Sequence, residues 1–183
     1  MKNFTADFGK LARSIKLVKQ APRQDMKVLI LGSGVVGGSI GGWLAQHDDH
    51  VMFFDKGDVA TVLKERGITL YPGDDPSRRE QVDVRVIDDL EEASDVDVVA
   101  IAVKNYSLEP VAKMVKDAFG DRPIVVGLQN GIANQDILPR YFSKVLYGIV
   151  SYNAWTDEPG VIGYQKKGPL HLGTMFNERA DET

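Results

Sequence analysis

The sequence predicts an α/β fold, with a doubly wound, mostly parallel sheet that begins near Met26 and a small antiparallel hairpin near the C-terminus. Three observations support this fold class. Apolar runs of strand length alternate with segments of helical periodicity, a glycine-rich turn joins the first strand to the first helix, and one strand is apolar on both faces. The 183 residues, 43% of them hydrophobic, suffice for one domain with a sizeable core.

The expected elements follow one another in strand–helix order. The segment 96–103 is almost continuously apolar, as a parallel strand covered on both faces should be. In 82–87, valines alternate with polar residues, which predicts one solvated face. Gly67 closes a helix, and a turn-rich loop spans 72–76. The expected strands are 27–31, 51–54, 68–71, 82–87, 96–103, 124–126 and 145–150, and the expected helices are 34–46, 59–66, 107–119 and one before Tyr141.

The first 25 residues form an extension with a different pattern. Apolar residues recur at helical spacing among basic ones, which predicts a helix that packs on its own or a neighbouring subunit. A membrane-surface helix and a targeting peptide are the alternatives. Ala21-Pro22 ends the segment, because the residue before proline is disfavoured in a helix. The apolar positions are Phe4, Phe8, Leu11, Ile15 and Val18.

The glycine-rich turn carries the strongest chemical signal. It follows a predicted strand and opens a helix, which is the context that the Rossmann-type dinucleotide-binding motif requires. The first glycine permits a tight turn, the second lets a pyrophosphate approach the backbone, and the third lets the helix pack against the sheet. The helix N-terminus then offers unpaired amides to the phosphates. The motif, and the predicted cofactor site, comprises Gly32, Ser33, Gly34, Val35, Val36 and Gly37.

Two residues after the second strand bear on the choice of cofactor. Asp55 lies about 20 residues past the glycines, where a carboxylate accepts hydrogen bonds from the adenosine ribose of NAD(H). Lys56 is a cation that can neutralise the 2′-phosphate of NADP(H). Asp55 and Lys56 alone do not decide between NAD(H) and NADP(H).

Composition excludes several other classes. The net charge of −4 argues against nucleic acid as the main partner. No apolar run reaches the length of a transmembrane helix, and there is no cysteine, which suits the cytoplasm. No metal site is expected, because the histidines of 47–50 lie at a predicted helix end without a further ligand cluster.

Four stretches in order resemble one family. They are the glycine-rich opening from Met26, Ala102-Val103-Lys104 at a strand end, Gln129-Asn130-Gly131, and the closing hairpin of Pro159-Gly160-Val161-Ile162 with Leu170-His171-Leu172-Gly173. From Met26 to about Thr174 the chain resembles the N-terminal domain of ketopantoate reductases, which places the nucleotide-binding domain at 26–176. The resemblance implies that Lys104 and Asn130 line the cleft for cofactor and a small 2-keto acid, and it favours NADP(H), with NAD(H) as the alternative.

The resemblance also implies a second, helical domain that carries the catalytic lysine and a substrate-binding glutamate. The polar tail 177–183 falls where the family's interdomain segment begins, so no catalytic residue is assigned in this chain, and the chain alone is expected to be inactive. From position alone, Lys104 also fits a solvated lysine and Asn130-Gly131 fits a turn. A stand-alone NAD(P)-binding regulatory module, a reductase of another small keto acid, and a homodimer are the open alternatives.

Overall fold

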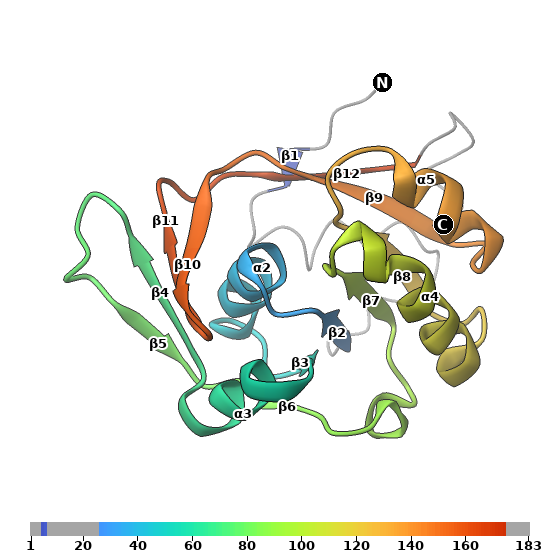
Figure 1. Ribbon diagram of the computed structural model, residues 1–183, viewed down its shortest axis with the longest axis horizontal. Coiled ribbons are helices and arrows are strands. Elements are labelled where there is room, and N and C mark those ends of the chain that lie inside the picture. The colour runs from blue at the N-terminus through green and yellow to red at the C-terminus, as the bar shows by residue number, and fades with distance from the viewer. Residues whose placement is uncertain (1–4, 7–25, 175–183) are drawn as a thin grey trace.

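The computed structural model describes residues 5–6 and 26–174, which form two sheets with helices packed against them (Figure 1). The larger sheet of the described chain has eight strands in the order β1-β12-β9-β8-β7-β2-β3-β6. From β9 to β6 neighbouring strands are parallel, whereas β12 and β1 are antiparallel additions at the β9 edge. The strands are β1 Thr5–Ala6, β2 Val28–Leu31, β3 Val51–Phe54, β6 Arg85–Val86, β7 Val98–Ile101, β8 Ile124–Gly127, β9 Val145–Val150 and β12 Leu170–Gly173.

The order of the parallel strands confirms the predicted doubly wound sheet. Counted along the chain, they lie third, second, first, fourth, fifth and sixth across the sheet, which is the arrangement of dinucleotide-binding folds. The order reverses between β2 and β7, where Leu31 pairs with Ile101 at the carboxyl ends of the two strands. Open α/β sheets bind their ligands at such a reversal point, outside the carboxyl ends of the strands.

A smaller sheet contains an antiparallel hairpin near the C-terminus, but its strands are not the predicted pair. The hairpin joins β10 and β11, whereas Leu170–Gly173, the predicted partner of Val161-Ile162, is β12 and pairs with β9 in the large sheet. The strand β11 also pairs in parallel with β4, which in turn pairs with β5. The hairpin therefore belongs to a four-stranded sheet that the sequence did not reveal. The strands are β4 Ile68–Pro72, β5 Glu80–Val82, β10 Ala154–Glu158 and β11 Val161–Tyr164.

The prediction of one strand over 82–87 is wrong. The strand β5 ends at Val82 in the small sheet, and β6 begins at Arg85 in the large sheet, where it extends the β3 edge. Val82, Val84 and Val86 nevertheless pack against the same hydrophobic core. The alternation of valines with polar residues therefore continues across the change of sheet. It indicates which side chains are buried, but it does not indicate which strand lies beside them.

Two hydrophobic cores lie on opposite faces of the large sheet. One core lies between this sheet, helix α2 and the small sheet, and the other lies beneath α4 and the 3₁₀ helix η1. Figure 1 shows α2 between the strands of the small sheet and β2 of the large sheet. The helices are α2 Val35–Ala45, α3 Gly57–Arg66, α4 Asn105–Phe119 and α5 Ala133–Ile137, and the 3₁₀ helices are η1 Leu90–Ala93 and η2 Leu138–Arg140.

The sandwiched position of α2 explains its many glycines. A Cβ atom on Gly37 would lie 1.9 Å from the carbonyl oxygen of Gly32, and one on Gly38 would lie 2.5 Å from the Cδ1 atom of Ile162 in the small sheet. The helix therefore needs glycine on both sides. This close packing offsets the intrinsic cost of glycine in a helix, about 1 kcal/mol per residue.

The termini are only partly described. The predicted N-terminal helix lies outside the described residues except for Thr5–Ala6, which form β1 and pair with β12 instead of forming a helix. The polar tail 177–183 also lies outside the described residues. Where the chain is described, no helix combines the length and apolar character needed to cross a membrane.

Candidate functional site

The glycine turn is held tightly between the first two strands and the loop after β7. Gly32 has φ of +91°, a left-handed conformation that glycine adopts without strain. Its amide donates to the carbonyl oxygen of Phe54 at 3.2 Å. A Cβ atom on Gly32 would approach Val103 to 3.0 Å, so the turn leaves no room for a side chain. The first glycine thus has the role that the motif predicts.

The second glycine leaves an open approach to the start of α2. Gly34 is the exposed residue before the helix, and a Cβ atom built on it meets nothing within 4 Å. No side chain caps the helix, and its first turn contains no acidic residue. The first-turn amides of Val35, Val36 and Gly37 have no helical acceptor, since the ladder begins with the bond from Gly38 to Gly34. An anion can therefore reach these amides and the positive end of the helix dipole.

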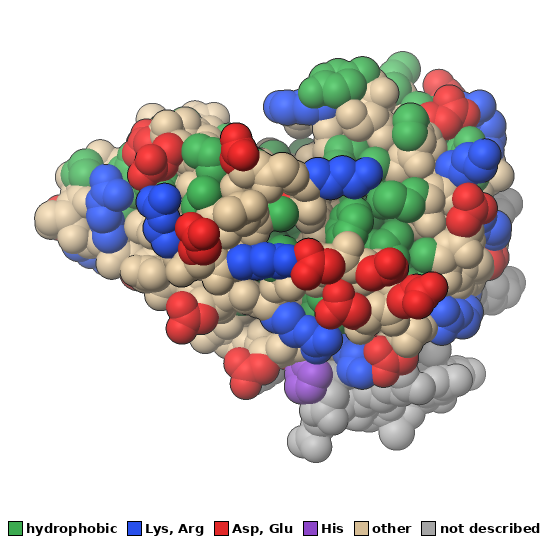
Figure 2. Space-filling view, turned by 60° about the horizontal axis from the view of Figure 1, so that its bottom comes forward, with side chains coloured by type: hydrophobic (Ala, Val, Ile, Leu, Met, Phe, Trp, Pro, Cys, Tyr) green, Lys and Arg blue, Asp and Glu red, His purple; other side chains and the backbone are tan. Residues whose placement is uncertain are grey.

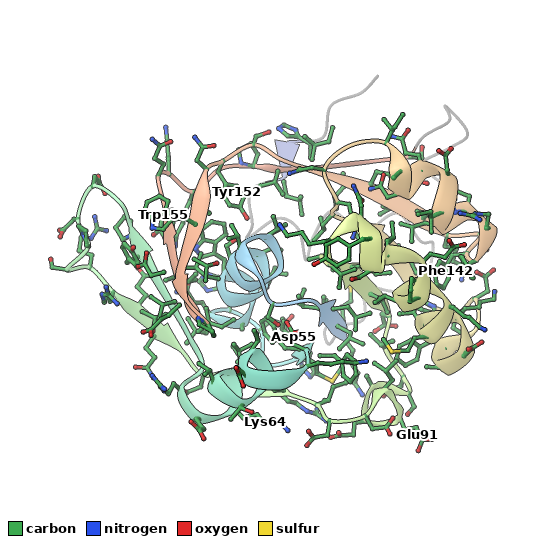
Figure 3. All side chains as sticks on the ribbon, viewed as in Figure 1. Asp55, Lys64, Glu91, Phe142, Tyr152 and Trp155 are labelled. Carbon is green, nitrogen blue, oxygen red and sulfur yellow. The ribbon has the colours of Figure 1, made fainter. Side chains whose placement is uncertain are left out.

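Asp55 contacts the glycine turn directly. Its Oδ2 atom accepts a hydrogen bond from the amide of Ser33 at 2.5 Å, and its Oδ1 atom accepts one from the amide of Lys56 at 2.8 Å. Figure 3 shows Asp55 near the centre of the molecule, beside the end of β2. The carboxylate thus holds the turn in place, a role that its position in the sequence did not reveal. The hydroxyl of Ser33 is buried in the same turn without a hydrogen-bond partner.

Lys56 lies at the exposed start of α3, directly after Asp55. Within the described chain its ammonium group forms no hydrogen bond or ion pair. A cation in this place is available to a ligand that enters from the Asp55 side.

The loops that carry Lys104 and Asn130 meet at the same edge of the sheet. Lys104 follows β7 and precedes α4, Asn130 follows β8, and both are exposed. The side-chain amide of Asn105 donates to the carbonyl oxygen of Asn130 at 3.0 Å, which ties the two loops together. Gly131 has φ of +87°, so a turn does follow Asn130. Because β7 and β8 both run parallel to β2, Lys104 and Asn130 lie at the edge of the sheet where the glycine turn lies.

Gln129 is a residue of this site that reasoning from the sequence left without a role. Its side chain is buried, and its Nε2 atom donates to the carbonyl oxygens of Ile101 at 2.7 Å and Val103 at 3.2 Å. Its Oε1 atom has no hydrogen-bond partner. The available signal was a polar residue that directly follows an apolar strand, where a buried amide is rare unless it is hydrogen-bonded.

The surface of the molecule has two hollows. Figure 2 shows an indentation between the lobe of the small sheet and the larger lobe of the central sheet and its helices. A further cavity of about 930 Å³ runs between η1 and α4 and begins at Phe54, the last residue of β3. Its lining includes the apolar residues Leu90 and Met114 and acidic residues such as Asp88.

The histidine-containing segment 47–50 lies elsewhere, at the C-terminal end of α2. The Nδ1 atom of His50 pairs with Asp48 at 3.0 Å. The described residues include no cluster of three or more side chains that could hold a metal ion.

These features define the class of protein. A parallel sheet with this strand order, a glycine turn at its reversal point and an uncapped helix N-terminus beside an acidic residue form a Rossmann-type dinucleotide-binding domain. Residues 28–177 match the family model for "Ketopantoate reductase PanE/ApbA". The chain therefore belongs to the ketopantoate reductase family, which confirms the resemblance seen in the sequence.

Individual relatives agree with the family. A 2-dehydropantoate 2-reductase of Pyrococcus abyssi is 28% identical over 152 residues, which cover 81% of this chain and 47% of that protein. A PanE/ApbA family ketopantoate reductase from Ralstonia eutropha JMP134 superposes with a TM-score of 0.69 and 28% identity. The superposition covers 78% of this chain and 47% of the Ralstonia chain. The chain thus spans about half the length of the curated relatives it matches.

A more distant structure shares the fold alone. D-mandelate dehydrogenase, solved with NADH and anilino(oxo)acetate, superposes with a TM-score of 0.69 at 21% identity, covering 84% of this chain and 50% of that protein.

Proposed function

We propose that this chain is the cofactor-binding part of an NADP(H)-dependent reductase that converts ketopantoate to pantoate. The observation that carries the proposal is the open approach at Gly34 to three amides that have no acceptor, in a chain of the ketopantoate reductase family. The pyrophosphate of a dinucleotide fits this approach, because it is an anion and needs backbone amides without a Cβ atom in the way.

The two halves of the cofactor lie on opposite sides of the glycine turn. The adenosine half extends over β3, where Asp55 and Lys56 follow the strand, and the nicotinamide half extends over β7 and β8, where Lys104 and Asn130 lie. Lys56 has no competing partner in the described chain, so it is the group that binds the 2′-phosphate of NADP(H). Asp55 already accepts two amide hydrogen bonds, and its main role is to hold the turn.

When bound, the reduced nicotinamide supplies a hydride to the keto carbon of the substrate. The Lys104 ammonium and the Asn130 amide lie on that side of the sheet and can donate hydrogen bonds to the keto oxygen or to the substrate carboxylate. The oxygen that becomes an alkoxide must also receive a proton. The family resemblance places the lysine that donates it in a helical domain, so turnover needs residues besides those described here.

Exposed apolar side chains support a site that another part of the protein completes. Tyr106 is 86% exposed, Ile132 74% and Ile149 67%, although each is a large hydrophobic residue. They lie in the first turn of α4, in the loop after β8 and near the carboxyl end of β9, beside Lys104 and Asn130. Exposed apolar surface at a ligand-binding edge is typical of an interface.

Two measurements on one sample test the proposal. Calorimetric titration of the chain with NADPH should show saturable binding, and a spectrophotometric assay with NADPH and ketopantoate should show no turnover near the roughly 10 per second of ordinary enzymes. Absence of NADPH binding would refute the cofactor assignment. Rapid turnover would refute the need for further residues.

A regulatory module that binds NAD(P)(H) without turnover is the second candidate, and reduction of another small keto acid is the third. The DNA that follows the codon for Thr183 separates the first two, because an open frame that encodes a helical domain favours the reductase. A panel of 2-keto acids, assayed with the longest product of that frame, identifies the substrate.

A further inference from the structure

The exposed Lys104 is held from both sides by the loop after β8. On one side, Val103 offers its carbonyl oxygen to the Nε2 atom of Gln129 at 3.2 Å. On the other side, Asn105 donates its side-chain amide to the carbonyl oxygen of Asn130 at 3.0 Å. Lys104 lies between these two anchored residues, and its own side chain is free to point into solvent.

The Gln129 side chain continues the hydrogen bonding between β7 and β8 beyond the last backbone pair. The carbonyl oxygen of Ile101 accepts from the Leu128 amide at 3.0 Å and from Gln129 Nε2 at 2.7 Å, so both of its lone pairs are used. After Ile101 the backbone ladder between β7 and β8 ends. The same amide group then bonds to Val103, where no backbone donor remains. The buried Gln129 side chain thus helps to fix the path of the chain from Ile101 to Lys104, together with the bond from the Ala102 amide to the carbonyl oxygen of Leu31 at 2.8 Å.

We propose that Gln129 is a positioning residue, which holds Lys104 and Asn130 in the arrangement that contacts the nicotinamide half of the cofactor. This inference rests on the proposed function, because it assumes that the nicotinamide half lies over β7 and β8. The adenosine half lies over β3, on the other side of β2, where Asp55 holds the glycine turn. Loss of the Gln129 hydrogen bonds should therefore weaken binding of the nicotinamide half more than binding of the adenosine half.

The test compares NADPH with 2′-phospho-ADP-ribose, which lacks the nicotinamide ring. Gln129→Met keeps the length and volume of the side chain but removes both donated hydrogen bonds. We expect about tenfold weaker binding of NADPH, the effect of losing one or two hydrogen bonds, and less than twofold weaker binding of 2′-phospho-ADP-ribose. Gln135→Met is the matched control. Gln135 lies on α5, shortly after Gln129 in the chain, and its side chain does not bond to Ile101 or Val103. It should leave both affinities unchanged.

A second variant keeps the test informative if the methionine variant fails to fold. Gln129→Glu retains the shape, but the ionised carboxylate would face two carbonyl oxygens. Burial raises the pKa of a carboxyl group, and the protonated form can donate one hydrogen bond. NADPH affinity of this variant should therefore recover, relative to wild type, as the pH falls through the raised pKa of the new carboxyl group. If Gln129 only stabilised the fold, its replacement would weaken binding of NADPH and of 2′-phospho-ADP-ribose together. Lowering the pH would then not restore NADPH affinity selectively.

The outcomes are separable. If the wild type binds neither ligand, the proposed function is wrong. If the wild type binds both and Gln129→Met changes neither, or weakens both equally, the positioning role is wrong. Selective loss of NADPH affinity, with pH-dependent recovery in Gln129→Glu, supports it.

Discussion

Replacing Gly34 with aspartate tests the cofactor site without disturbing the fold. Gly34 has φ of −68°, which any residue can adopt, and a Cβ atom there meets nothing within 4 Å. Aspartate is also a favourable residue before a helix, since its carboxylate accepts a hydrogen bond from the first turn. Gly34→Asp should therefore leave the melting temperature unchanged or raise it slightly, while it occupies the approach to the amides of α2.

The expected loss of affinity follows from charge. A carboxylate at this position would face the phosphate oxygens of a bound pyrophosphate, and about 4 Å is an ordinary separation for two charged groups in contact. Two like charges at that separation repel by about 4 kcal/mol at the effective dielectric constant near a protein surface. Since 1.4 kcal/mol is a factor of ten, NADPH affinity should fall on the order of a thousandfold. The neutral analogue, Gly34→Asn, has almost the same shape and should lose much less.

Isothermal titration calorimetry with NADPH, beside thermal unfolding of the same samples, measures both quantities. Gly34→Ala is a further control that adds only a methyl group to the open space. Wild-type affinity in Gly34→Asp would show that the pyrophosphate does not bind at this turn. Equal losses in the aspartate and asparagine variants would show that bulk, and not charge, determines the effect.

Three further predictions concern other parts of the molecule. Lys56→Ala should weaken NADPH binding by about 1–3 kcal/mol, the range of a charge-assisted hydrogen bond, and leave NADH binding unchanged. Asp55→Ala should weaken binding of both cofactors, because its carboxylate holds the glycine turn. Titration of both variants with both cofactors decides this, and equal small effects would mean that neither side chain contributes to cofactor binding. Burial raises the pKa of Tyr152 to about 12. Its contribution to stability is therefore complete below pH 10 and is lost as the pH rises from 10 to 12, because the tyrosine of the unfolded chain ionises first. Denaturant unfolding should show an alkaline loss of stability that is smaller in Tyr152→Phe by up to about 3 kcal/mol, and an identical loss would contradict the assignment. The exposed apolar residues should also promote self-association of this chain. A double change of Tyr106 and Ile132 to serine should then reduce self-association in analytical ultracentrifugation, and a monomeric wild type at high concentration would contradict this prediction.

The sequence predicts the large sheet well because its physical signals are local. Val51–Phe54 and Val145–Val150 form strands over the predicted residues, and the glycine turn follows its strand as the motif requires. Continuous apolar character predicted the buried strand β7, although its backbone pairing covers only Val98–Ile101 of the predicted 96–103. Strand length is set by pairing with neighbours, which apolar character alone does not record.

The small sheet was missed because its strands come from distant parts of the chain. The hairpin at 154–164 joins β4 through parallel pairing with Ile68–Pro72, about ninety residues earlier. No local pattern reports such a pairing. The glycines of α2 were the indirect signal, since they predicted close packing but not which sheet would approach.

The sequence predicts candidate site residues but not the hydrogen bonds between them. Gly34 and Asp55 are candidates from their positions in the motif, and Lys104 and Asn130 are candidates from the family resemblance. The hydrogen bonds from Ser33 to Asp55, and from Gln129 to the end of β7, depend on side-chain directions that only the three-dimensional arrangement provides.

Amide chemical shifts during a titration with NADPH test the central claim most directly. In ¹⁵N-labelled protein, the largest changes should fall on Ser33, Gly34 and the first turn of α2, with smaller changes at Lys104 and Asn130. These residues line the predicted path of the cofactor across the reversal point of the sheet. Saturable changes at these amides are the result that we expect. No change at millimolar NADPH, or changes confined to residues away from the glycine turn, would contradict the assignment of this chain as a dinucleotide-binding domain.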